Sequence, residues 1–206
     1  YLAALHKGTS TPMVYLDFYD EREMSDSVIS NSYYGSYLLT NYLFDMGHEN
    51  IAYVGSLLCS TSITDRYFGY ARSMMEHGKA VPDEWVIPDR DMEFGKVDVE
   101  IDYNGFEKKP TAFVCNCDLT ASKVVKRLKE QGIRVPEDVS VTGFDNYLYP
   151  GLCDVEITSY EVDVKEMSRK AVHILLRKIE DSRYQKGIAI IDGRMVVKDS
   201  VNRIVD

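Results

Sequence analysis

The chain has 206 residues, of which 45% are hydrophobic, 28% charged and 11% aromatic, as in a folded domain with a sizeable core. Its 33 acidic residues outnumber 24 basic ones, and the net charge of −9 argues against the chain gripping nucleic acid by itself. Its apolar runs stay well below the roughly 20 residues of a membrane-spanning helix, so a membrane protein is excluded.

Apolar residues recur with periods that alternate between those of strands and helices. In chain order, the pattern predicts a strand over 12–16, a helix over 33–46, a strand over 51–55, a helix over 64–77, a strand over 111–115, a helix over 118–131, a strand over 139–143 and a long helix from 163 to about 180. Asp118 is a suitable N-cap for its helix, and Asp163 with Glu166 forms a variant of the capping box. Residues 189–191 and 195–197 flank an Asp-Gly-Arg turn, which is typical of a hairpin. The alternation predicts parallel βα units in an α/β fold.

Sequence signatures of the common catalytic and nucleotide-binding sites are missing. The chain has no GxGxxG, GxxxxGK[ST], GxSxG or HExxH segment, and no pair of carboxylates is placed by spacing as an acid and a base. The four cysteines have no disulfide or metal spacing, which favours free thiols in a reducing cytosol over a disulfide framework. We therefore predict neither an enzyme nor a metal or cofactor site.

Polar side chains follow several predicted strands at their carboxyl ends. Asp17, Asp145 and the pair Cys117-Asp118 each come after an apolar strand, and Arg66 lies near the start of the second predicted helix. Each residue alone is explained by a local role, such as a helix cap, a turn carboxylate or a surface charge. Together they suit a hydroxyl-rich ligand at one sheet edge, because carboxylates accept hydroxyl hydrogen bonds and a guanidinium donates several.

Four segments share their order and spacing with one known family. They are 47–55 (GHENIAYVG), similar to GHxxIAxxxG; 65–70 (DRYFGY), similar to R-x-x-G-[FYW]; 132–145 (GIRVPEDVSVTGFD), similar to GxxVPxDxxVxGFD; and 157–160 (ITSY) with the helix that follows. In these segments the sequence resembles the LacI/GalR family of transcriptional regulators. The resemblance covers essentially all of the chain.

The resemblance implies an α/β core of the periplasmic-binding-protein-like type I. Two lobes of parallel sheet flanked by helices would be joined by three crossover segments, near Ser30, near Ser159 and over 191–196. The implied lobes are an N-lobe of 1–30 and 161–190 and a C-lobe of 31–160 and 191–206. Members of the family begin with a helix-turn-helix headpiece and an opening part of the N-lobe. This sequence starts beyond both, so we expect the N-lobe to be incomplete.

The same resemblance implies a ligand site in the cleft between the lobes. Arg66 matches the ligand-clamping arginine of the family, Asp145 its ligand carboxylate after the Gly-Phe pair, and Asp17 a cleft aspartate of sugar-responsive members. Met92 stands where an aromatic residue often stacks on the ligand. Cys117 takes the place of an asparagine before the C-lobe helix. The predicted ligand is a sugar or sugar derivative.

These features predict the effector-binding core of a cytoplasmic, ligand-responsive transcriptional repressor. By resemblance it would act as a homodimer, with helix 118–131 and loop 147–152 in the dimer contact, and would reach operator DNA only through the headpiece. The alternative is a secreted solute-binding protein of a sugar transporter, which has the same fold. The four thiols and the segment ending in Phe144-Asp145 favour the regulator.

Overall fold

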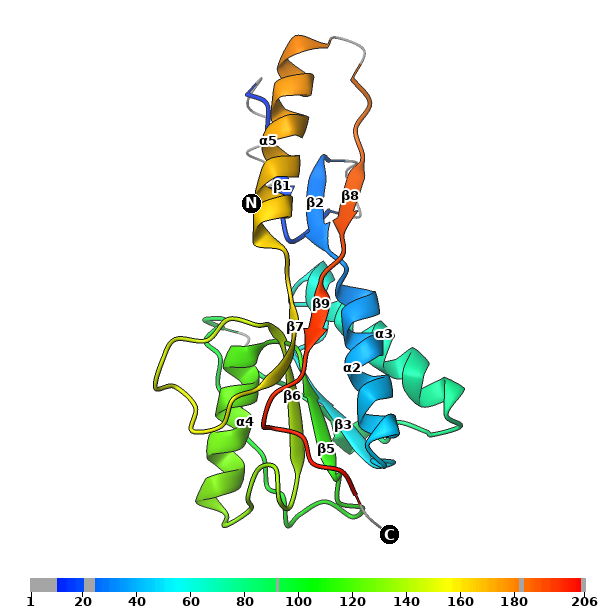
Figure 1. The fold of residues 1–206 in the computed structure, drawn as a ribbon, viewed down its shortest axis with the longest axis vertical. Coiled ribbons are helices and arrows are strands. Elements are labelled where there is room, and N and C mark those ends of the chain that lie inside the picture. Colours follow the sequence, from blue (N-terminus) through cyan, green and yellow to red (C-terminus); the bar gives the residue numbers. More distant parts are fainter. Residues whose placement is uncertain (1–10, 21–24, 92, 182–183, 205–206) are drawn as a thin grey trace.

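The described part of the chain forms two β-sheets that lie end to end along the long axis of the molecule (Figure 1). The computed structural model describes residues 11–20, 25–91, 93–181 and 184–204. The smaller sheet has the strand order β1 (Tyr15–Leu16), β2 (Ser27–Ser30), β8 (Ile188–Ile191). The larger sheet has the order β4 (Val86–Ile87), β3 (Ile51–Val54), β5 (Ala112–Cys115), β6 (Ser140–Asp145), β7 (Thr158–Glu161), β9 (Arg194–Val196).

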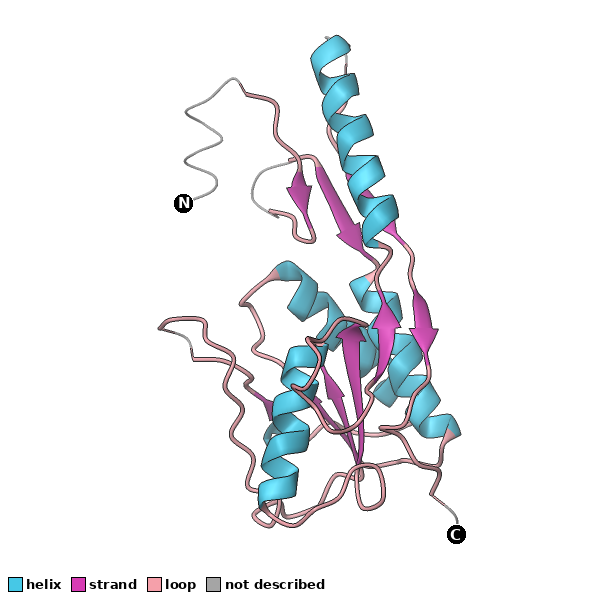
Figure 2. Ribbon diagram, turned by 60° about the vertical axis from the view of Figure 1, so that its left-hand side comes forward, coloured by secondary structure: helices cyan, strands magenta, loops and turns pink. Residues whose placement is uncertain are grey.

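Within the described ranges, four α-helices cover these sheets. They are α2 (Ser32–Asp45), α3 (Thr61–Glu76), α4 (Asp118–Glu130) and α5 (Val164–Glu180), and a short 3-10 helix spans Asp83–Trp85. Helix α4 packs on one face of the larger sheet, α2 and α3 lie on the other, and α5 covers the smaller sheet (Figures 1 and 2). All neighbouring strands pair in parallel except β7 and β9, so the predicted α/β class is confirmed. Over the described ranges, every helix is too short or too polar to cross a lipid bilayer.

Polar caps set the starts of three helices. The side chain of Asn31 accepts from the backbone N–H of Tyr34, and that of Asp163 accepts from Glu166, as the capping pattern predicts. Helix α3 begins three residues before the expected start, because the Ser60 hydroxyl accepts from the N–H of Ile63. The predicted capping role of Asp118 is wrong: Cys117 occupies the N-cap position of α4, and no side chain caps that end.

The main hydrophobic core lies around the central strands of the larger sheet. Strands β3 and β5 are buried at every residue, and β6 is buried except at its last one. Helices on both faces of a parallel sheet leave no solvent face, which explains why these strands are apolar runs and not alternating patterns. A smaller core lies under α5, where Val28 of β2 packs with Met167, Ala171 and Ile174.

Three segments connect the two sheets in the part of the chain that the structure describes. The chain passes from β2 into α2 at Asn31, from β7 into α5 at 162–163, and from β8 into β9 at 192–193. The predicted hairpin around 192–194 is therefore wrong. Strand β8 pairs with β2 in the smaller sheet, whereas β9 pairs with β7 in the larger one. Gly193 permits this crossing, since a Cβ there would lie 2.1 Å from the carbonyl oxygen of Glu161.

Candidate functional site

Arg66 is buried between the sheets although it carries a full charge. Its residue surface is only 5% exposed. Its Nε donates to the Ser32 hydroxyl at 3.3 Å, and its Nη1 donates to the carbonyl of Asn116 at 2.6 Å. Helix α3 brings it there by packing closely on α2: a Cβ at Gly69 would lie 2.0 Å from the carbonyl oxygen of Tyr33. Bonds to fixed partners hold the guanidinium in one orientation.

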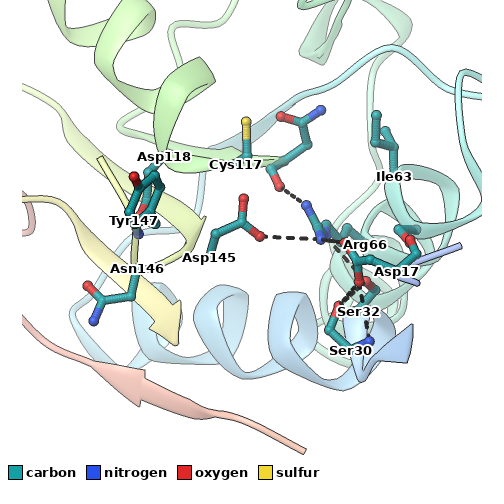
Figure 3. Close-up of polar contacts among 12 residues, drawn as sticks. Asp17, Ser30, Ser32, Ile63, Arg66, Cys117, Asp118, Asp145, Asn146 and Tyr147 are labelled. Atoms are coloured by element: carbon teal, nitrogen blue, oxygen red, sulfur yellow. Dashed lines mark hydrogen bonds and ion pairs between the residues drawn. The ribbon is translucent and has the colours of Figure 1, made fainter. Parts of the chain in front are cut away.

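Two carboxylates from different sheets flank the same nitrogen of Arg66. Its Nη2 lies 3.6 Å from Oδ2 of Asp17, which follows β1, and 3.5 Å from Oδ1 of Asp145, which ends β6 (Figure 3). The structure thus brings together three of the predicted site residues. Their cluster spans the junction between the smaller and the larger sheet.

Both carboxylates sit on backbone that few side chains adopt. The φ angle is 59° at Asp17 and 94° at Asp145, in the left-handed region that costs a non-glycine residue free energy. Ser30 holds Asp17 in place by donating its hydroxyl at 2.6 Å and its backbone N–H at 3.3 Å to Oδ1. At each strand end the carboxylate lies close to Arg66 (Figure 3).

The carboxylates remain open to solvent while the arginine is not. The side chain of Asp17 is 44% exposed and that of Asp145 is 39% exposed. Partial burial raises the pKa of Asp145; the Arg66 guanidinium opposes this shift and the Asp17 carboxylate adds to it. One guanidinium shared by two carboxylates leaves acceptor oxygens that are not neutralised. The site therefore presents acceptors to a ligand.

Two cavities meet at Asp17. One, of about 510 Å³, is also lined by Asp145 and is walled by Leu16, Asn146, Tyr147, Glu161, Val162, Val164, Met167 and Ser168. The other, of about 940 Å³, is lined by Phe18, Tyr19, Phe68 and the segments 58–61 and 64–65. Both volumes are large enough for a small organic ligand.

Hydrogen bonds that the sequence did not predict join the segment after β1 to the start of α3. The Ser62 hydroxyl donates to the carbonyl of Asp17, and the N–H of Tyr19 donates to the Thr61 hydroxyl at 3.2 Å. The Tyr19 hydroxyl lies 3.2 Å from both carboxylate oxygens of Asp65. The only sequence signal is the run of hydroxyl residues at the helix start, which is explained equally well by capping.

A fully buried carboxylate, Asp89, is linked to Arg66 through Asn116. It accepts from the N–H of Ser56 at 2.8 Å, from Asn116 at 2.9 Å, from Thr120 at 2.8 Å and from the Arg90 guanidinium. Burial opposes its charge, but the hydrogen bonds outweigh burial and lower the pKa of Asp89 to about 2. This network fixes Asn116, whose carbonyl accepts from Arg66. Nothing in the local sequence distinguishes Asp89 from a surface carboxylate.

Two further residues were predicted for the site, Cys117 and Met92. Cys117 lies beside Asp145 at the start of α4 (Figure 3), where its thiol is 3.3 Å from the Thr120 hydroxyl. Burial raises the pKa of Cys117, which keeps the thiol neutral. Met92 lies outside the described residues. Among the residues that the structure describes, no three metal-ligating side chains come together.

The two sheets and their flanking helices form an α/β fold, and the comparisons agree with it. Residues 40–201 match the family described as the periplasmic binding protein-like domain. The match covers more than half of the chain, so the chain belongs to that family. The periplasmic-binding-protein-like α/β fold implied by the resemblance is confirmed.

Curated relatives are transcriptional repressors. The chain is 30% identical over 201 residues to the HTH-type transcriptional repressor PurR of Vibrio campbellii, covering 97% of this chain and 60% of that protein. It is 31% identical over 182 residues to PurR of Glaesserella parasuis, covering 88% of this chain and 54% of that protein. The chain thus spans about 60% of the first of these relatives.

Solved structures confirm the resemblance to LacI-type regulators at the level of the fold. A LacI transcriptional regulator from Bacillus cereus subsp. cytotoxis has a TM-score of 0.83 at 21% identity, covering 99% of this chain and 72% of that chain. A LacI family transcriptional regulator from Enterococcus faecium with bound ribose has a TM-score of 0.76 at 20% identity, covering 94% and 72%.

Proposed function

We propose that the chain is the effector-binding core of a LacI-type transcriptional repressor. A small ligand binds between the two sheets and favours one arrangement of the lobes, and the change in arrangement alters DNA binding by a helix-turn-helix headpiece. The observation that carries this proposal is the position of Arg66 between Asp17 and Asp145. Because these carboxylates belong to different lobes, a ligand that bonds to both of them binds best at one distance between the lobes.

The ligand class follows from which groups at the site are still free. Arg66 is buried and its donors point at protein acceptors, whereas Asp17 and Asp145 keep exposed oxygens. A ligand that satisfies these oxygens must donate hydrogen bonds and must not add negative charge. A neutral sugar or sugar derivative fits, as expected from the sequence. The Enterococcus faecium structure with bound ribose supports the same class.

We propose the sequence-derived lobe boundaries, 1–30 with 161–190 and 31–160 with 191–206, as the two bodies that move. The repressor is proposed to be a cytoplasmic homodimer that binds operator DNA through the headpiece. The spacing of the four cysteines, which matches no disulfide framework, supports a reducing compartment. The curated relatives and the structural neighbours named above are transcriptional regulators. This favours a regulator over a solute-binding protein of a transporter and over an enzyme.

Thermal shift against D-ribose, inosine and ribose 5-phosphate tests the proposal. We expect a neutral compound to raise the melting temperature of the wild type, and the phosphosugar to be weaker because its charge meets the two carboxylates. Asp145→Ala should abolish the shift, whereas Asp138→Ala, a remote exposed aspartate, should keep it. A normal shift in Asp145→Ala would place the ligand elsewhere. A shift with the phosphosugar alone would overturn the ligand class.

A further inference from the structure

Asp118 is a buried carboxylate that does not cap its own helix. It is the first residue of α4 and only 3% exposed. Its Oδ1 accepts from the Ser159 hydroxyl at 2.7 Å, and its Oδ2 accepts from the N–H of Tyr147 at 2.8 Å. Both donors lie outside α4: Ser159 belongs to β7, which leads into one of the connections between the sheets, and Tyr147 follows β6. The carboxylate therefore joins three elements.

These hydrogen bonds hold the turn that carries Asp145. Asp145 and Asn146 have consecutive positive φ angles of 94° and 50°. Two such residues in a row are unfavourable unless their surroundings fix them. The N–H of Asn146 donates to the Ser159 hydroxyl at 3.0 Å, and that hydroxyl donates in turn to Asp118. Asp118 thus restrains the turn directly through Tyr147 and indirectly through Ser159.

The space around Asp118 is shaped for this carboxylate. A Cβ at Gly143 on β6 would lie 2.1 Å from its Oδ1, so only glycine permits the approach. Beyond the turn, the loop 146–152 exposes Tyr147 and Tyr149 at 66% each, together with Leu152. Figure 3 shows Asp118 beside Tyr147, with Asp145 between this pair and Arg66.

We propose that Asp118 is a positioning residue that fixes the Asp145 carboxylate for the ligand and couples it to loop 146–152. This inference rests on the proposed function, because it gives Asp118 a part in the response of the same cleft. A movement of Asp145 toward a ligand shifts Asn146 and Tyr147, and both are tied to Asp118. The exposed tyrosines are thereby coupled to the occupancy of the cleft.

Ionisation of Asp118 should make the opening of loop 146–152 depend on pH, which a purely steric role of this residue would not do. Burial raises its pKa to about 7, helped by the charge of Asp145 and opposed by the hydrogen bonds of Ser159 and Tyr147 and by the charge of Lys198. The thiols of Cys115 and Cys153 also face it. Opening of the loop hydrates the carboxylate and restores its ordinary pKa. Opening therefore becomes easier as the pH rises from about 4 to 7.

Hydrogen–deuterium exchange of the backbone amides of Asn146 and Tyr147, corrected for intrinsic exchange rates, tests the proposal without any ligand. We expect Asp118→Ala to lower the protection of both amides by at least about tenfold. At pH 5, Asp118→Asn should stay within about threefold of the wild type, because its amide can donate to Ser159 while its oxygen accepts from Tyr147. Ser122→Ala is the matched control: Ser122 lies on the same helix, is buried, and donates its hydroxyl to the carbonyl of Leu119.

The pH profile separates positioning from packing. Wild-type protection should fall between pH 5 and pH 8, and that of Asp118→Asn should stay constant. If Asp118→Ala does not fold, Ser159→Ala should lower the protection of Asn146 more than that of Tyr147. Wild-type protection in Asp118→Ala, or an equal loss in Ser122→Ala, would overturn the proposal. Because no ligand is used, a failure here is independent of whether D-ribose or inosine binds.

Discussion

The guanidinium of Arg66 stacks on the ring of Phe144, with its Cζ 3.9 Å from the ring centroid. Phe144 is the residue directly before Asp145, so one strand end supplies both the flat surface and the carboxylate that hold the arginine. Cation–π contact in a buried setting stabilises the charge that burial alone disfavours. This stacking explains how an arginine can sit between the sheets with a single nitrogen pointing at both carboxylates.

Replacing Arg66 by lysine should weaken the fold even though the charge is kept. Lysine lacks the planar fork that reaches Ser32 and Asn116 together, and it lacks the stacking surface for Phe144. We expect a loss of about 1–3 kcal/mol in the free energy of unfolding, measured by urea denaturation. Arg72→Lys on the exposed side of the same helix should change it by less than about 0.5 kcal/mol. Equal urea midpoints for the two variants would contradict the stacking role.

The pH dependence of stability should carry a contribution from Asp118. Its folded-state pKa of about 7 exceeds the ordinary value of 3.8, so the folded state keeps a proton that the unfolded state has lost. The stabilising contribution of Asp118 to the free energy of unfolding is fully present below about pH 4. It falls as the pH rises toward 7 and does not change further above pH 7. As the pH rises from 4 to 8, the free energy of unfolding of Asp118→Asn should increase on the order of 3 kcal/mol relative to that of the wild type. Parallel curves of unfolding free energy against pH would refute this assignment.

Asp89 should act in the opposite direction at acid pH. Its pKa is lowered from 3.8 to about 2, so its stabilising contribution is present above pH 4 and is lost as the pH falls through 2. In the wild type, protonation of Asp89 in acid should lower the free energy of unfolding by about 2 kcal/mol, and Asp89→Asn should not show this loss. Acid titrations followed by circular dichroism measure the difference. Asp138→Asn serves as the surface comparison: hydrogen bonds from Arg134 also lower the pKa of Asp138 to about 2, but this pair is exposed and solvent screening should keep its contribution to stability small. An unchanged acid transition in Asp89→Asn would show that Asp89 is not ionised in the fold.

Gly143 should tolerate no side chain. Its Cβ would lie 2.1 Å from the Asp118 carboxylate and 3.0 Å from Ile157, which are both buried. Gly143→Ala should therefore cost about 1–3 kcal/mol of unfolding free energy and should lower the protection of the Tyr147 amide. At Gly187 no atom lies within 4 Å of the added Cβ, so Gly187→Ala is the control and should be nearly neutral. Similar melting temperatures for the two variants would mean that Asp118 can move without cost.

Local patterns predicted the helices well because the interactions that start and end a helix lie within four residues. The cap of α5 is one case: Asp163 accepts from the N–H of Glu166, as the sequence indicated. The cluster of Arg66, Asp17 and Asp145 was also anticipated, from strand-end positions and the family resemblance, although its role in ligand binding stays a prediction.

What the local sequence could not decide is which distant segments meet. Strands β8 and β9 look like a hairpin, but the partner of Ile191 is Ser30, 161 positions away, and the partner of Met195 is Tyr160. The sequence pattern predicted a helix cap at Asp118, and the approach of Ser159 and Tyr147 instead makes this residue a link between elements. Sheet pairing and buried polar contacts depend on the packing of both lobes, so the tertiary structure alone determined them.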